Sequence, residues 1–488
     1  MKKTIGTVSL MLAVISVCSA AVRDHDAVYN RIEKEYTLSA DGSQSCRTVL
    51  ELTYNSYHAI HSLYGETFID YNPQWQELVI NSSFTKLSDG TKVLTPENAF
   101  VPTLPGFADS APAHNGLVRM VVVHTGLEKG CKAYLDYTII SRPGYLPELD
   151  FSIPVETDSP IDELKISVTV PEGKKLAYSF SKNNYDPVET SSDGTRKYVW
   201  NIKDVGAASS DPGGYRKSVF SATTFPSFED AFSFLKEQFI KENDLDSATT
   251  AQLLANGPDD EKIASVNRFL RSHLDIVPIP LEAACYKLRS ASQILESAYA
   301  TPAEREVLRC ALLKASGVKA EIVPICPSDP VGLGDISGLM AKAVSEAGEL
   351  STEKTFSVTS KFGKDDLKNG YLVAELQFPE HAFKGTPYST YPSSRTNELL
   401  LHRNINEVHE YEILLQDGIV PSGLEKMNAE ISNGAGFYSV KADRNGDRVT
   451  VRRTLEIYKS TVSPAEYPDF MELISVWSDA PKFIVRKP

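Results

Sequence analysis

The stretch Thr301-Pro302-Ala303-Glu304-Arg305-Glu306-Val307-Leu308-Arg309-Cys310-Ala311-Leu312-Leu313-Lys314-Ala315-Ser316-Gly317 carries strong helix signals. Thr301 is a typical N-cap, Pro302 suits the first helical position, and Glu304 completes a capping box. Gly317 stands where a glycine commonly ends a helix. The sequence therefore predicts a helix from Pro302 to Ser316.

The surroundings of this helix predict a central α+β domain over residues 225–345. Apolar residues recur at helical spacing in 228–242 and 260–274, and 319–325 has the pattern of a strand buried on both faces. The Gly-, Ser- and Lys-rich segment 331–364 is typical of a linker or an exposed loop.

Both flanking regions are rich in strand patterns. Residues 21–224 alternate β-branched and aromatic runs with turn pairs such as Asp89-Gly90, which predicts an antiparallel β-sandwich. Residues 346–488 predict a β-rich domain, closed by a helix that a second capping box, Ser463 to Glu466, opens and that ends near Trp477. The fold class is thus multidomain α+β.

Length and composition set broad limits on function. The chain has 488 residues, with 42% hydrophobic and 23% charged residues, which indicates several globular domains and excludes extensive disorder. Its net charge is −14, and no cationic patch stands out, so we expect no nucleic-acid partner.

The N-terminus predicts export. Lys2 and Lys3 precede a short apolar run, residues 8–17, and small residues follow it, so residues 1–20 match a signal peptide. We expect a periplasmic protein without a membrane span. The alternative is a lipoprotein or cell-surface form acylated at Cys18.

Five cysteines remain after that leader, and they predict no metal site: Cys46, Cys131, Cys285, Cys310 and Cys326. None of their spacings matches a structural zinc site, and we expect no cofactor. In an oxidising compartment this odd number leaves at least one thiol free or paired between chains. Two disulfides are possible, one between Cys46 and Cys131 and one between Cys326 and either Cys285 or Cys310. The alternative is that these cysteines are buried free thiols.

Residues 260–324 contain the motifs Glu261-Lys262, Arg289-Ser290-Ala291 and Ile294-Leu295, followed by the 300–317 helix and its strand. With these motifs the segment resembles the transglutaminase-like superfamily of exported bacterial proteins. Residues 78–100, with their Ser88-Asp89-Gly90-Thr91 turn, resemble the domain of unknown function of family 3857. A terminal β-domain similar to 395–488 completes an arrangement familiar from Bacteroidota. The resemblance implies a papain-like α+β centre.

The resemblance also implies where a catalytic triad would stand, and the sequence departs from it. Transglutaminase-like enzymes place a nucleophilic cysteine at the start of the central helix, with a histidine and an aspartate on following strands. Here Pro302 occupies the helix start, and no histidine lies between His273 and His381. We therefore assign no catalytic residue.

Four residues remain as alternative catalytic candidates. Cys285 or Cys310 could act as a nucleophile with His273 or His381 as base. Alternatively, both cysteines are ordinary packed thiols without a catalytic role, and His381 lies in a turn after a strand. A separate cluster of tyrosine and histidine side chains, including Tyr57, His58 and His61, predicts either an exposed aromatic surface or strand-edge packing.

These observations favour an exported, non-catalytic binding or scaffolding module of the cell envelope, with a protein, peptide or glycan as its partner. One alternative is a thiol-dependent peptidase or amide-transferring enzyme. A second is a surface adhesin or structural subunit. The oligomeric state is left open.

Overall fold

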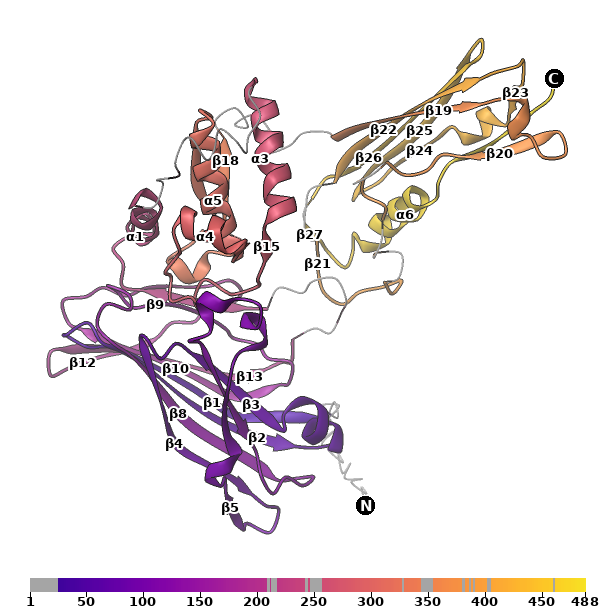
Figure 1. Ribbon diagram of the computed structural model, residues 1–488. Coiled ribbons are helices and arrows are strands. Elements are labelled where there is room, and N and C mark those ends of the chain that lie inside the picture. The colour runs from indigo at the N-terminus through magenta and orange to yellow at the C-terminus, as the bar shows by residue number, and fades with distance from the viewer. Residues whose placement is uncertain are drawn as a thin grey trace, which may run out of the picture.

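The structure is a computed structural model that describes residues 25–208, 211, 217–241, 245, 257–326, 329–343, 354–379, 382–385, 388, 391–401, 405–459 and 461–488. Its N-terminal part is a layered β structure, its centre combines helices with short strands, and its C-terminal part is β-rich with one closing helix (Figure 1). The predicted multidomain α+β architecture is confirmed.

An eight-stranded sheet forms the base of the N-terminal part. Only β1 and β10 pair in parallel, whereas the other neighbouring strands of this sheet are antiparallel. In spatial order the strands are β12 (Val188–Ser192), β13 (Thr195–Val205), β10 (Ile161–Pro171), β1 (Ala27–Leu38), β2 (Gln44–Tyr54), β8 (Lys132–Ser141), β4 (Gln76–Lys86) and β5 (Lys92–Leu94).

One face of this sheet is apolar. Residues directly paired across neighbouring strands point to the same side, so one row of partners defines the face. That row is Leu135, Leu50, Ile32, Leu164 and Ile202. The opposite face is polar, and there Arg47 forms ion pairs with Glu35 and Asp136.

Two small sheets, rather than one continuous sheet, cover the apolar face. In the first, Ile69 and Val122 pack against Leu135; in the second, Phe220 packs against Trp200. The first sheet consists of β3 (Glu66–Tyr71), β7 (Val118–Val123) and β6 (Phe100–Thr103), and the second of β11 (Ala177–Phe180), β14 (Val219–Thr223) and β9 (Asp150–Pro154). The second layer of the sandwich is therefore split.

The central part is built around α5 (Pro302–Ala315). Its Thr301 side chain accepts a hydrogen bond from Glu304 N, and Glu304 in turn accepts one from Thr301 N, so the predicted capping box and helix are confirmed. Around α5 lie α1 (Phe228–Lys241), α3 (Asp259–His273), α4 (Ala291–Ser297) and the paired strands β15 (Asp275–Ile276) with β16 (Tyr299–Ala300) and β17 (Ala320–Ile325) with β18 (Gly338–Ala343).

Glu304 also anchors the segment that precedes α4. Its carboxylate accepts two hydrogen bonds from Arg289, Nε to Oε1 and Nη2 to Oε2, both 2.9 Å long. The Arg289 guanidinium lies over the ring of Tyr299, 4.3 Å from its centroid. Because this ion pair is shielded from water and bidentate, it fixes the loop before α4 against the start of α5.

Asp150 of β9 joins the sandwich to the central part. Its Oδ2 accepts hydrogen bonds from Leu333 N (3.0 Å) and Thr223 Oγ1 (2.6 Å), and its Oδ1 accepts one from Gly334 N (2.8 Å). Asp335 adds a second link, because its Oδ1 accepts hydrogen bonds from the hydroxyls of Ser152 and Ser221. We call Asp150, Asp335 and the loop 331–335 the interdomain clasp.

The clasp requires glycine at close approach. A Cβ atom on Gly334 would lie 2.7 Å from the backbone nitrogen of Ser152, and one on Gly332 would lie 2.1 Å from Asp150 Oδ2. Such contacts are too short for any side chain. The prediction of a linker over 331–364 is therefore wrong for its described residues, since 331–335 forms the clasp and β18 and β19 (Lys354–Phe362) are paired strands.

The predicted double burial of 319–325 is also wrong. Strand β17 has β18 as its only partner strand among the described residues, and Glu321 and Ile325 are exposed. A strand buried on both faces needs layers on each side of its sheet, and in this two-stranded ladder the buried residues Ile322, Leu339 and Ala341 share one hydrophobic cluster with residues of α5 and α1.

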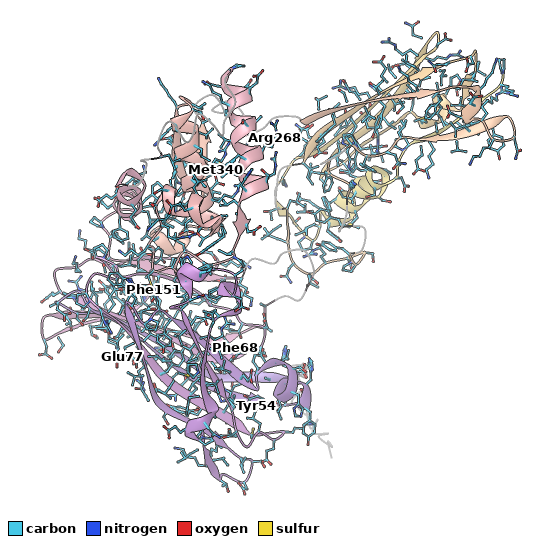
Figure 2. The ribbon with its side chains drawn as sticks, viewed as in Figure 1. Tyr54, Phe68, Glu77, Phe151, Arg268 and Met340 are labelled. Atoms are coloured by element: carbon cyan, nitrogen blue, oxygen red, sulfur yellow. The ribbon has the colours of Figure 1, made fainter. Side chains whose placement is uncertain are left out.

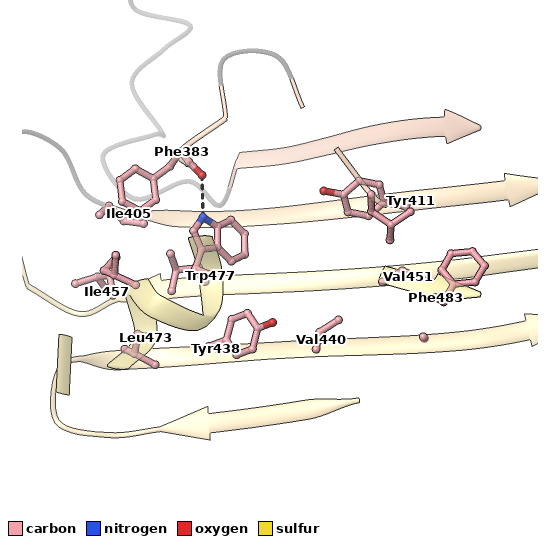
Figure 3. Packing of buried hydrophobic residues seen from close by; sticks show 14 of the residues in the cluster. Phe383, Ile405, Tyr411, Tyr438, Val440, Val451, Ile457, Leu473, Trp477 and Phe483 are labelled. Atoms are coloured by element: carbon pink, nitrogen blue, oxygen red, sulfur yellow. Dashed lines mark hydrogen bonds between the residues drawn. The ribbon is translucent and has the colours of Figure 1, made fainter. Parts of the chain in front are cut away.

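The C-terminal part packs its sheets around α6 (Tyr467–Ser478), and Trp477 lies in its core, with its indole Nε1 donating to Phe383 O at 2.8 Å (Figure 3). The largest sheet has the order β19, β22 (Asn406–Leu415), β26 (Arg448–Ile457), β25 (Gly436–Asn445), β24 (Ala429–Ser432). Beside it lie β20 (Tyr371–Glu375), β28 (Lys482–Arg486) and β23 (Val420–Ser422), and the pair β21 (Leu399–Leu400) and β27 (Thr461–Val462).

Helix α6 begins later than its capping signal predicts. Ser463 and Glu466 exchange the expected hydrogen bonds, but the helix starts at Tyr467. Pro468 explains the difference, because it has no N–H to donate to the carbonyl of Pro464 and is tolerated only in a first helical turn.

Gly334→Ala should loosen the attachment of the central part to the sandwich. The new Cβ would collide with backbone atoms of β9, which cannot move without breaking their ladder, so we expect a loss of about 1–3 kcal/mol in the free energy of unfolding. Thermal and urea denaturation measure it. Gly173→Ala is the matched control, because a Cβ there meets nothing within 4 Å. Equal stability of the two variants would contradict the role of the clasp.

Candidate functional site

A cavity of about 430 Å³ lies where the split second layer of the sandwich meets the central part. Its floor is the apolar face of β1, β2 and β8, and its sides come from β3, β9 and the loop 280–283. Phe151, at the junction of the two parts in Figure 2, stacks on Tyr36 of the floor with ring centroids 3.5 Å apart. The volume falls in the range of roughly 300–1,000 Å³ found for small-ligand sites.

Lys34 is the cation of this cavity. It extends from β1 between the inward-facing residues Ile32 and Tyr36, and its Nζ donates a hydrogen bond to Thr48 Oγ1 (3.0 Å). Burial acts to lower the pKa of Lys34, but the neighbouring Tyr137, Cys46 and Glu282 side chains outweigh it and hold the pKa above its ordinary value. Lys34 is therefore charged at neutral pH.

Glu282 lies on the wall opposite, in the loop before α4. Its carboxyl group makes no hydrogen bond or ion pair with any residue that the structure describes, and it borders the cavity. The residue as a whole is exposed to solvent, yet desolvation of its carboxyl group raises its pKa, and the charge of Lys34 opposes that effect. Two further carboxyl groups border the cavity: Asp70, which pairs with Arg119, and Asp150, whose oxygens accept hydrogen bonds from Thr223, Leu333 and Gly334. Among the described lining residues, Lys34 is thus the one lysine or arginine, and Glu282 is the carboxyl group without a hydrogen-bond partner.

The loop that carries Glu282 has an unusual backbone. Cys285 and Tyr286 both have positive φ, 56° and 53°, although neither is glycine. Each such residue costs on the order of 1 kcal/mol, so the surrounding contacts must hold the loop in place. Gln238 of α1 provides two of them, since its side chain donates to Tyr286 O and accepts from Leu288 N. Strain of this kind gathers at functional sites.

A second cavity of about 250 Å³ adjoins the first and reaches the start of α5. Both cavities are bordered by Ser152, Pro280 and Glu282, and the second is also lined by Pro302 and Ala303. The position that the transglutaminase-like resemblance reserves for a nucleophile is therefore at a cavity wall. Pro302 supplies no nucleophile there.

The two candidate cysteines are packed in the core and are not activated. Cys285 is 1% exposed and Cys310 2% exposed. Burial raises the pKa of Cys285 to about 11, against the opposing effects of a hydrogen bond from Asn72 and the charge of Lys287. Burial also raises the pKa of Cys310, against Lys314. Neither thiol gains the thiolate character that a nucleophile needs.

His273, the candidate base that the structure describes, makes its contacts with residues of its own helix. His273 stacks on Phe269 of its own helix with ring centroids 4.5 Å apart, and its Nδ1 lies 2.7 Å from Ser272 Oγ. His381 lies outside the described residues. No thiol–imidazole pair is therefore assembled within the part of the chain that the structure describes.

The remaining cysteines, and the cluster of tyrosine and histidine side chains around Tyr57, make contacts with nearby residues. All five described cysteines are free thiols, so none of the disulfides that the sequence left open is formed here. Cys131 Sγ accepts a hydrogen bond from Glu128 N, and Cys46 borders the larger cavity. Tyr57 is exposed and stacks loosely on His61, with ring centroids 6.3 Å apart.

Sequence reasoning missed Lys34 and Glu282. For Lys34 a signal existed, because Ile32, Lys34 and Tyr36 alternate on one face of a strand, and lysine at an inward-facing position is uncommon. Glu282 carried no local signal, since its place depends on how the central part docks on the sandwich.

Comparisons with known proteins relate this α+β chain to two domain families and to a solved structure. A model of the domain of unknown function 3857 (DUF3857) matches residues 40–209, and one of the domain of unknown function 3858 (DUF3858) matches residues 370–482. A solved structure of a "putative protease" from Parabacteroides distasonis is 33% identical, with a TM-score of 0.81, over 94% of this chain and 99% of that chain. The chain therefore belongs to the same family as that protein.

Other matches are far weaker. Two structures of an M1 zinc metallopeptidase from Deinococcus radiodurans, one of them of a mutant form, match about 40% of this chain and 42% of theirs, at 8–9% identity and TM-scores of 0.20–0.21. No curated protein matches the chain. Among the described residues, no helix is long and apolar enough to cross a membrane.

Alkylation should show the inert character of the two candidate thiols. With a pKa of about 11, only about one Cys285 in ten thousand is ionised at pH 7, so iodoacetamide should label it at least a hundredfold more slowly in the native protein than in urea. Cys310 should behave alike. Digestion and mass spectrometry of samples taken over time give both rates. Rapid native labelling of either cysteine at pH 7 would restore the thiol-enzyme interpretation.

Proposed function

We propose that this protein is an exported, non-catalytic peptide-binding module of the cell envelope, which holds its ligand in the cavity between the sandwich and the central part. The observation that carries the proposal is the cavity itself, bordered by Lys34, Glu282 and aromatic side chains, next to a helix start at which Pro302 replaces a nucleophile. Sites that combine apolar walls with a few convergent polar groups are typical of ligand binding.

A peptide suits this cavity better than a bare glycan or a protein surface. Its wall combines the rings of Phe107 and Phe151 with phenolic, amide and charged groups. The second cavity adjoins the first at Ser152, Pro280 and Glu282 and reaches α5, so an extended chain that follows both cavities would run past Glu282. The family relative named as a protease supports the same ligand class, because proteases and peptide-binding modules both recognise polypeptide chains.

A second candidate function is thiol-dependent peptide hydrolysis, which the name of the Parabacteroides distasonis protein favours. It needs Cys285 or Cys310 as nucleophile, and both are buried thiols with raised pKa. Peptide cleavage that Cys285→Ala or Cys310→Ala abolishes without unfolding the protein would establish it.

Filling the cavity should prevent peptide binding. Ala283→Trp adds a large ring at the cavity wall, so we expect the retention of randomised hexapeptides in equilibrium dialysis to fall about tenfold or more. Ala264→Trp, on the exposed side of α3, is the control and should bind as the wild type does. Mass spectrometry of the same samples should recover the peptides intact. Unchanged retention by Ala283→Trp would exclude this cavity as the site.

A further inference from the structure

The larger cavity has the sheet as its floor, and the second cavity adjoins it on the side of the central part. Strands β1, β2 and β8 form this floor, and Ser152, Pro280 and Glu282 border both cavities. A chain that enters past the loop 280–283 meets Lys34 and the rings of Tyr36 and Tyr137 at the floor. Such a site suits the end of a chain better than its middle.

The floor is built to receive an anion. An ammonium group has three donors, and Lys34 uses one of them on Thr48 Oγ1. Tyr36 and Tyr137 border the same space and carry hydroxyl groups that can donate to an anionic oxygen. The Lys34 ammonium would repel a terminal amine. A carboxylate placed here would gain a charge-assisted hydrogen bond that an uncharged amide could not replace.

Glu282 decides the direction of the bound chain. Glu282 borders both cavities, and its charge and that of Lys34 act on each other. In its ionised form Glu282 would repel a ligand carboxylate placed beside it, whereas a ligand carboxylate at the floor would meet the Lys34 ammonium. The two charged side chains therefore orient a peptide with its anionic end inward.

On these grounds we propose that the site recognises the free carboxy-terminal end of a peptide, with Lys34 binding the α-carboxylate and the preceding residues running past Glu282 towards the start of α5. This inference rests on the proposed peptide-binding function. It adds the ligand group that is recognised, the residue that recognises it and the polarity of the chain.

Two pools of N-acetylated randomised hexapeptides test the inference on the full-length mature protein, one pool with a free α-carboxylate and the other with an α-carboxamide. Equilibrium dialysis followed by mass spectrometry gives the fraction of each pool that is retained. We expect the wild-type protein to retain the free acids about tenfold or more over the amides. This comparison needs no variant and so does not depend on how a substitution folds.

Lys34→Met then assigns the preference to one residue. It keeps most of the side-chain volume and removes the charge, so the ratio of acid to amide retained should fall to about one. Lys132→Met is the control, because this lysine lies on the same sheet but pairs with Glu51 and does not border the cavity. It should keep the wild-type ratio.

The outcomes separate the two proposals. Equal retention of both pools by the wild-type protein would overturn carboxylate recognition while leaving peptide binding intact. An acid preference that survives in Lys34→Met would overturn the assignment to this cavity floor. Failure to retain either pool would overturn peptide binding, and the inference with it.

Discussion

The structure depends on one buried carboxylate, that of Asp150. Its two oxygens accept hydrogen bonds from two successive backbone N–H groups of the central part and from Thr223 of its own domain. Burial raises the pKa of Asp150 to about 6. The three hydrogen bonds act to lower this pKa, and the charge of the nearby Asp335 adds to the rise. Backbone donors cannot be withdrawn without being left unsatisfied, so the contact sets the position of the central part on the sandwich.

That position creates the cavity. The two small sheets leave the middle of the apolar face without strand cover, and the docked loop 280–283 forms the remaining wall. This loop carries Glu282, and the two left-handed residues Cys285 and Tyr286 follow it. Gln238 of α1 and the Arg289–Glu304 pair at the start of α5 hold the segment in place. A site assembled in this way belongs to neither domain alone, which explains why the thiols and histidines of the central part do not define it.

Local signals predicted the local structure well, and non-local contacts explain what they missed. The Thr301–Glu304 capping box and Pro302 fix α5 within a few residues of sequence, and α5 was predicted to within one residue of its end. Glycines 332 and 334 resembled a flexible linker, because close approach to Asp150 and Ser152, about 180 residues earlier, is invisible in their own neighbourhood. Lys34 carried a sequence signal, since lysine is uncommon at an inward-facing strand position, whereas the place of Glu282 beside the cavity depends on the same distant docking.

Calorimetric unfolding of Asp150→Ala is the most direct test of this account, with Asp186→Ala, an exposed aspartate of the sandwich, as the control. The clasp predicts that the sandwich and the central part unfold together in the wild-type protein and the control. In Asp150→Ala two backbone N–H groups lose their buried acceptor, so the central part should unfold in a separate transition at lower temperature. An unfolding profile of Asp150→Ala that matches the wild type would show that the clasp does not hold the two parts together.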